Sequence, residues 1–231
     1  MLKAIIFDFN GVILDDEPLH FRSMRDAVAA VGILITREEY WNEYLPLDDT
    51  RCVEAIGKNH RVALTAATRA AILKQKSIFY RRLLSDKFPL FSGAAEIIRS
   101  ASQKYPLALA SGASREEIET TLSATNLRDC FRIIVAAEDF TLGKPHPESF
   151  LLALRGLNEA LDGIGPKILP GECLVIEDSV GGIKGARAAG MMCLAVANSY
   201  PANDLRHANW VVSSLEDVCL DSLQDLTEEI A

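Results

Sequence analysis

Short apolar runs recur along the chain, separated by longer segments in which apolar and polar residues alternate at helical spacing. Each of five runs is about four residues long and nearly continuous, which is typical of strands buried on both faces of a parallel sheet. These strands are predicted at 4–7, 107–110, 133–136, 174–176 and 194–197. Amphipathic helices are predicted at 94–104, 114–125, 147–157 and 182–189. Strands that alternate with helices predict an α/β fold, a doubly wound parallel sheet with a Rossmann-like core.

Residues 17–90 depart from this alternation. Four segments there have helical spacing, at 18–31, 38–44, 50–56 and 64–84, and none reads as a strand. We therefore expect residues 1–15 and 91–231 to form the α/β core, and residues 16–90 to form an inserted all-helical cap domain. Near the C-terminus, the stretch 221–229 holds four acidic residues in nine and is predicted to be a solvated helix face.

Composition and charge narrow the possible functions. The 231-residue chain is 49% hydrophobic and 24% charged, and its formal net charge is -8. An acidic protein lacks the basic surface that attracts nucleic acids and anionic membranes, and no apolar segment approaches the roughly 20 residues of a membrane span. The N-terminal sequence has no signal-peptide pattern, and the five cysteines include no C-x-x-C pair. We expect a cytoplasmic monomer or weak dimer with reduced thiols and no nucleic-acid or membrane partner.

Polar residues follow four of the predicted strands. In chain order they are Asp8, Ser111, Gly112, Lys144, Glu177 and Asp178. Ligands of open α/β sheets bind at the carboxyl ends of the strands, so we expect these residues to meet. Clustered carboxylates repel one another, and Mg²⁺, which prefers carboxylate and carbonyl oxygens, relieves that repulsion. Lys144, Ser111 and backbone N–H groups would suit a phosphate beside the metal.

An ordered set of motifs covers essentially the whole chain. The motifs are D-F-N-G-V at 8–12, D-D-E-P-L-H at 15–20, A-S-G-A-S-R at 110–115, G-K-P-H-P-E-S-F at 143–150 and V-I-E-D-S-V-G-G-I-K-G-A-R-A-A-G-M at 175–191. With these motifs the sequence resembles the haloacid dehalogenase-like hydrolase superfamily. The resemblance is to the branch with a helical cap inserted after the first motif, which includes β-phosphoglucomutase and phosphoglycolate phosphatase.

The resemblance implies an Mg²⁺-dependent phosphatase, a phosphoric monoester hydrolase that acts on a small phosphorylated metabolite. Asp8 would be the nucleophile and would form an aspartyl-phosphate that water later hydrolyses. The backbone carbonyl of Asn10, together with Asp8, Glu177 and Asp178, would bind the metal. Position 10 is also the position of a catalytic residue in the family.

The resemblance also implies a phosphate site. Ser111 and Lys144 would hold the transferring phosphoryl group, and backbone amides near Gly11 and Gly112 would support them. Lys144 and the metal would offset the charge on the phosphoryl group in the transition state.

The family places substrate selection on the cap. His20 matches a histidine that can relay protons in β-phosphoglucomutase-like proteins, although packing at the hinge is an equal reading. Lys76 begins a K-x-x-x-Y spacing found in relatives that act on sugar phosphates. Arg51 is the obvious anion contact of the loop 45–51, which lacks a glycine–serine–arginine turn. We therefore favour a phosphatase over a sugar phosphomutase, which is the alternative enzyme.

Position 10 departs from the family pattern. The family has a second aspartate there, which protonates the leaving oxygen and then deprotonates the attacking water. Asn10 has no proton to give or take at physiological pH, and general acid–base assistance is worth about 10²–10⁴-fold. Four explanations are open. The chain is a natural variant that acts on substrates with good leaving groups or uses another acid, or it is a catalytically impaired phosphometabolite-binding protein. Alternatively, it is an engineered Asp→Asn trap, or a protein in which slow deamidation of Asn10-Gly11 generates the aspartate.

Overall fold

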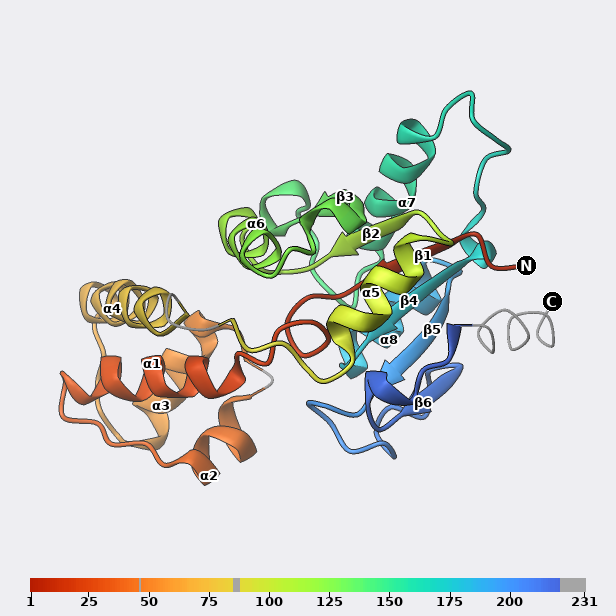
Figure 1. Cartoon of the computed structure of the whole chain (residues 1–231). Coiled ribbons are helices and arrows are strands. Elements are labelled where there is room, and N and C mark those ends of the chain that lie inside the picture. Colours follow the sequence, from red (N-terminus) through yellow and green to blue (C-terminus); the bar gives the residue numbers. More distant parts are fainter. Residues whose placement is uncertain (46, 85–87, 221–231) are drawn as a thin grey trace. The chain divides into compact units, whose positions relative to one another are not determined.

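The computed structural model of the protein describes residues 1–45, 47–84 and 88–220, so the stretch 221–229 lies outside the described residues. The chain divides into two compact units (Figure 1). The α/β unit comprises residues 1–15 and 89–231, and the helical unit comprises residues 16–88. Pro89 and Leu90, which were expected in the helical segment, belong to the α/β unit.

A six-stranded parallel sheet forms the centre of the α/β unit, with the strand order β3-β2-β1-β4-β5-β6 (Figure 1). The strands are β1 (Ala4–Phe7), β2 (Leu107–Ala110), β3 (Phe131–Val135), β4 (Cys173–Glu177), β5 (Met192–Val196) and β6 (Trp210–Val212). The predicted doubly wound α/β fold is confirmed. Phe7 of β1 pairs with Leu109 on one side and Ile176 on the other, so β1, β2 and β4 end at the same edge.

The helices of this unit are α5 (Ala94–Ser102), α6 (Arg115–Ala124), α7 (Glu148–Ala160) and α8 (Val180–Ala188). Phe150 of α7 and Ile183 of α8 pack in one core with Ile6, Ala108 and Val175 of the sheet. Burying a side chain as large as Phe150 contributes about 1.5–3 kcal/mol. The apolar strand runs are therefore continuous because helices cover them, as the pattern predicted.

The helical unit contains α1 (Glu17–Ala29), α2 (Arg37–Glu39), the π-helix η1 (Tyr40–Tyr44), α3 (Asp49–Asn59) and α4 (Ala66–Leu84). Its core is formed by apolar residues of the longer helices, among them Met24, Val28, Val53, Ile56 and Ile72. These residues recur at helical spacing, which is why the sequence predicted helices throughout this segment.

The helix predicted at 38–44 is not a continuous α-helix. Leu45 N donates to Tyr40 O (3.0 Å), which closes the wider ring of a π-helix. In this turn Tyr40 and Trp41 both pack against the ring of Phe21, and Tyr44 is fully buried. The aromatic packing therefore accompanies a turn that the apolar spacing alone did not predict.

The edge strand β6 is the other element that the apolar pattern missed. It is only three residues long, so its apolar run is too short to be recognised as a strand. Its side chains are only partly buried. Among the described residues, no helix combines the length and the apolar character needed to cross a bilayer.

The chain leaves and re-enters the α/β unit through adjacent segments. Asp15 N donates to Pro89 O (2.8 Å), and Leu14 forms an antiparallel bridge with Leu90. These contacts fix the two ends of the insertion beside each other at the end of the loop that follows β1.

Candidate active site

Asp8 stands at the end of the central strand. Its backbone N–H donates to Ile176 O (2.9 Å), so sheet pairing extends one residue past β1. The following loop is held by its own backbone, since Gly11 N donates to Leu14 O (3.0 Å), and by Asn198 Nδ2, which donates to Gly11 O (2.8 Å). Gly11 has φ +78°, a conformation that glycine adopts at little cost. The position of Asp8 is thus set by the sheet and by a rigid loop.

Lys144 lies between two buried carboxylates. Its Nζ is 2.6 Å from Asp8 Oδ1 and 2.6 Å from Glu177 Oε1. The structure thereby brings together predicted residues that are far apart in the sequence. Asp178 joins them, because carboxylate oxygens of Asp8, Glu177 and Asp178 lie within 4.8 Å of one another.

Both oxygens of Glu177 have protein partners. Oε1 accepts from Lys144, and Oε2 accepts from the backbone of Asp178 (2.8 Å) and from the backbone and hydroxyl of Ser179 (2.8 and 2.9 Å). Burial alone would raise the pKa of Glu177, but Lys144 and these donors hold the pKa below its usual value. Glu177 is thus an ionised residue that holds Lys144 in place.

The pKa values of the other two carboxyls, Asp8 and Asp178, are raised. Burial raises the pKa of Asp8 to about 6, although Lys144 acts in the opposite direction. Burial, followed by the charges of Glu177 and Asp8, raises the pKa of Asp178 well above its usual value. Three carboxyls face one ammonium. Burial alone would lower the pKa of Lys144, but the carboxylates of Asp8 and Glu177 outweigh burial and raise that pKa. This oxygen donor set with excess negative charge fits a divalent cation such as Mg²⁺.

Ser111 and Gly112 follow β2 at the same edge of the sheet. Ser111 is buried, its N–H donates to Val135 O (3.0 Å), and its hydroxyl accepts from Ala113 N (3.1 Å). Gly112 is exposed, and a β-carbon there would meet nothing within 4 Å. The backbone at Gly112 is therefore accessible to a small anion.

The side chain of Asn10 contacts a residue that the motifs did not indicate. Asn10 Nδ2 donates to Glu117 Oε1 (3.4 Å). Glu117 lies in the first turn of α6, where Ser114 Oγ accepts from its N–H (3.3 Å). The helix predicted at 114–125 does begin at this turn, but the contact with Asn10 has no signal in the sequence. Asn198 was also missed, although it follows β5 and the strand-end rule that found Asp8 could have found it.

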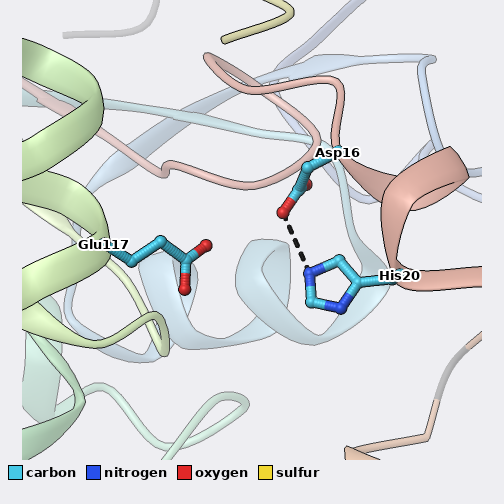
Figure 2. A group of neighbouring side chains, drawn as sticks. All are labelled: Asp16, His20 and Glu117. Carbon is cyan, nitrogen blue, oxygen red and sulfur yellow. Dashed lines mark hydrogen bonds and ion pairs between the residues drawn. The ribbon is translucent and has the colours of Figure 1, made fainter. Parts of the chain in front are cut away.

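In the helical unit, two of the three predicted substrate residues contact each other. His20 Nε2 lies 2.9 Å from Asp16 Oδ2 (Figure 2), and its Nδ1 is 2.6 Å from Lys76 Nζ. Lys76 is buried and also donates to Asp49 Oδ2 (2.8 Å). An ammonium can only donate, so Nδ1 is the acceptor and Nε2 carries the proton shared with Asp16. His20 is therefore held in one tautomer.

Arg51, the third of these residues, has an exposed side chain. Its backbone N–H donates to Asp48 Oδ1 (3.0 Å), which caps α3, and its Nε is 3.4 Å from Asp48 Oδ2. An exposed pair of this kind is weak, because water competes for both charges. Arg51 is thus able to exchange Asp48 for another anion.

Comparisons with known proteins agree with this geometry. A family model described as haloacid dehalogenase-like hydrolase matches residues 2–190. Protein CbbY of Rhodobacter capsulatus is 29% identical over 97% of this chain and 99% of its own length. Hexitol phosphatase B of Escherichia coli is 29% identical over 98% of this chain and 95% of its own. A crystal structure of β-phosphoglucomutase from Clostridium difficile superposes with a TM-score of 0.81 at 25% identity, covering 100% and 99% of the two chains.

Proposed function

Because the chain belongs to the haloacid dehalogenase-like hydrolase family, we propose that it is an Mg²⁺-dependent phosphatase of a small phosphorylated metabolite. The observation that carries the proposal is the position of Lys144, 2.6 Å from both Asp8 and Glu177. A lysine anchored by one buried carboxylate beside a second one is suited to offset charge on a phosphoryl group. Lys144 can offset that charge while it stays beside Asp8, the neighbouring carboxylate.

Asp8 is the proposed nucleophile. One carboxylate oxygen attacks phosphorus, the bond from phosphorus to the ester oxygen breaks, and an alcohol leaves. With an amide at position 10, the proton for that alcohol comes from the substrate monoanion or from solvent. Water then attacks phosphorus, the bond to the Asp8 oxygen breaks, and both protons of the water leave on H₂PO₄⁻. Lys144 and Ser111 bind the phosphoryl oxygens in both steps.

Mg²⁺ would be bound by Asp8, Asp178 and the backbone carbonyl of Asn10. Glu177 has protein partners at both of its oxygens, so its proposed role is to hold Lys144 rather than to ligate the ion directly. When bound, the ion supplies positive charge opposite the phosphoryl oxygens. It would also remove the electrostatic cost that raises the pKa of Asp8 and Asp178.

For the substrate we propose a sugar phosphate or a sugar-alcohol phosphate. The support is the name of one relative, hexitol phosphatase B, which shares 29% identity over nearly its whole length. The helical unit is proposed to serve as a cap domain, with exposed Arg51 as its anion contact. His20, which is partly exposed and is held by buried Lys76, would present a polar group to the substrate.

Asn10 favours a second candidate, a protein that binds a phosphometabolite without turning it over. An amide cannot exchange the proton that the family's second aspartate exchanges. Mg²⁺-dependent binding would survive, because it needs only the backbone carbonyl at this position. Such a protein would show a rise in melting temperature with Mg²⁺ and a sugar phosphate, and no release of product.

Phosphate release with Mg²⁺ tests both candidates across sugar phosphates, sugar-alcohol phosphates, phosphoglycolate and acetyl phosphate. Wild type, Asn10→Asp and Asp8→Asn are compared side by side. We expect wild type to release phosphate and Asp8→Asn to release none. If only Asn10→Asp releases phosphate, the phosphatase proposal fails and the proposal of a phosphometabolite-binding protein is supported. An isomeric sugar phosphate formed without free phosphate would indicate a sugar phosphomutase.

A further inference from the structure

We propose that Glu117 is a positioning residue that fixes the orientation of the Asn10 side chain beside the nucleophile. The proposal rests on the phosphatase function proposed above, because it gives Asn10 a role in that reaction. Both residues belong to the α/β unit, and Asn10 Nδ2 lies 3.4 Å from Glu117 Oε1. The contact joins the loop after β1 to the first turn of α6.

The backbone on both sides of this contact is fixed. In the loop, Asn10 bridges to Leu14, and Gly11 is held by backbone and side-chain hydrogen bonds. On α6, the Ser114 hydroxyl accepts from Glu117 N, which anchors the first turn of the helix. The rotation of the amide group at position 10 is then set by side-chain contacts, and among these the Glu117 carboxylate accepts from Nδ2.

The chemistry of the two groups decides which way the amide turns. A carboxylate only accepts hydrogen bonds, whereas an amide group has a donor end and an acceptor end. The nitrogen of Asn10 must therefore face Glu117, and its Oδ1 lies on the opposite side of the amide group. A water or a substrate hydroxyl that meets this side encounters an acceptor. Asn10 can then orient the hydrogen of the attacking water, although it cannot take that proton.

The contact also explains how an asparagine is compatible with its surroundings. An aspartate at position 10 would place a second carboxylate within hydrogen-bond distance of Glu117, and like charges at that distance repel. The uncharged amide avoids this repulsion and gains a charge-assisted hydrogen bond instead. Asn10 and Glu117 thus form a matched pair in this chain.

Three variants separate this role from a general effect on the fold. Glu117→Ala removes the acceptor, and Glu117→Gln keeps an acceptor oxygen without the charge. Glu116→Ala is the matched control, because Glu116 is an exposed acid on the same turn. We expect Glu117→Ala to lower kcat on the order of tenfold with KM little changed, since misorientation of a positioned group acts on the chemical step. Glu117→Gln and Glu116→Ala should stay within about twofold of wild type.

A double-variant comparison tests whether Glu117 acts through Asn10. In an Asn10→Ala background, Glu117→Ala should cause no further loss of kcat, because the group it positions is gone. An equal loss in both backgrounds would overturn the proposal, as would an unchanged kcat in Glu117→Ala. Melting temperatures identify any variant that fails to fold. If Glu117→Ala is among them, Glu117→Leu, which fills a similar volume without an acceptor oxygen, takes its place in both backgrounds.

A second readout does not depend on activity. Nitrogen-15 NMR of asparagine-labelled protein reports the side-chain NH₂ of Asn10, which the Asn10→Asp variant identifies by the loss of its signals. We expect these signals to move in Glu117→Ala and to keep their hydrogen-bonded positions in Glu116→Ala. Signals that do not respond to Glu117→Ala would overturn the proposal. If wild type shows no turnover, the phosphatase proposal fails, and the NH₂ signals alone decide whether Glu117 orients Asn10.

Discussion

Gly11 and Asp178 lie so close together that a β-carbon at position 11 would come within 2.0 Å of Asp178 Oδ2. The loop after β1 and the loop after β4 therefore meet without room for any side chain between them. Gly11 also has φ +78°, so two independent constraints require glycine at this position.

Replacing this glycine should damage both the fold and the site. We expect Gly11→Ala to lower the free energy of unfolding by about 1–3 kcal/mol, from backbone strain and from displacement of the Asp178 carboxylate. Phosphatase activity should fall by more than the loss of folded protein accounts for. Urea denaturation and phosphate release measure the two effects. Gly165→Ala is the control, since a β-carbon there meets nothing within 4 Å, and an equal effect of both changes would contradict the argument.

Lys144 should matter for stability as well as for activity. Lys144→Met leaves Asp8 and Glu177 as buried carboxyls without their shared cation, and breaking a buried ion pair in this way costs about 3–5 kcal/mol. The expected result is a lower urea midpoint and no phosphate release. Lys184→Met, a change at an exposed lysine on α8, is the control. Equal urea midpoints for Lys144→Met and wild type would show that the buried cluster does not depend on this lysine.

Metal binding should depend on pH in a defined direction. The pKa of Asp8 in the folded protein is about 6, above its ordinary value of 3.8. In metal-free protein, ionising this carboxyl is thus harder in the folded state than in the unfolded state, and stability falls as pH rises from 3.8 through 6. A bound divalent cation must displace the proton, so its affinity rises over the same window. The rise in melting temperature caused by Mg²⁺ should be small at pH 5 and large above pH about 7.

Thermal melts with Mg²⁺ or with a chelator, recorded from acidic to mildly alkaline pH, make this measurement. Asp178→Asn should show a reduced Mg²⁺ effect throughout, because it removes a proposed ligand. A shift in melting temperature that stays constant with pH in wild type would mean that these carboxyls do not titrate with metal binding.

The helical unit offers an independent test in Tyr80. Its hydroxyl donates to Asp16 Oδ2 (2.5 Å), and Asp16 is buried beside His20. We expect Tyr80→Phe to reduce stability by about 1.5–3 kcal/mol, the usual value of a hydrogen bond to a charged group. Chemical denaturation measures the change against Tyr105→Phe, at a partly exposed tyrosine of the α/β unit. A loss no greater than that of the control would show that Asp16 does not depend on this donor.

The strand pattern predicted the sheet because helices cover both of its faces and keep each run apolar. Strands β1 and β2 have the predicted limits. Strand β3 begins earlier than predicted because exposed Arg132 interrupts the apolar run, while Phe131 still pairs with Leu107 in the sheet. Backbone pairing thus continues where the side-chain pattern stops. Strand β6 was missed for another reason, because its apolar run is only three residues long.

The sequence could predict those site residues that lie at strand ends or in the loops directly after them. Asp8 and Glu177 stand at strand ends, and Lys144 is in the loop after β3, so topology alone brings these loops together. Glu117 and Asn198 reach the loop after β1 across 107 and 187 residues of sequence, through contacts that no spacing encodes. The distances between charges, which raise the pKa of Asp8 and Asp178, likewise required the folded structure.

The hydrogen bond from Asp15 N to Pro89 O places the exit and the re-entry of the chain beside each other. A short turn joining these two residues would close the backbone of the α/β unit without moving any strand. The helical unit is therefore an insertion whose two ends lie side by side at Asp15 and Pro89. Insertion of another module between the same two residues would leave intact the sheet that positions Asp8.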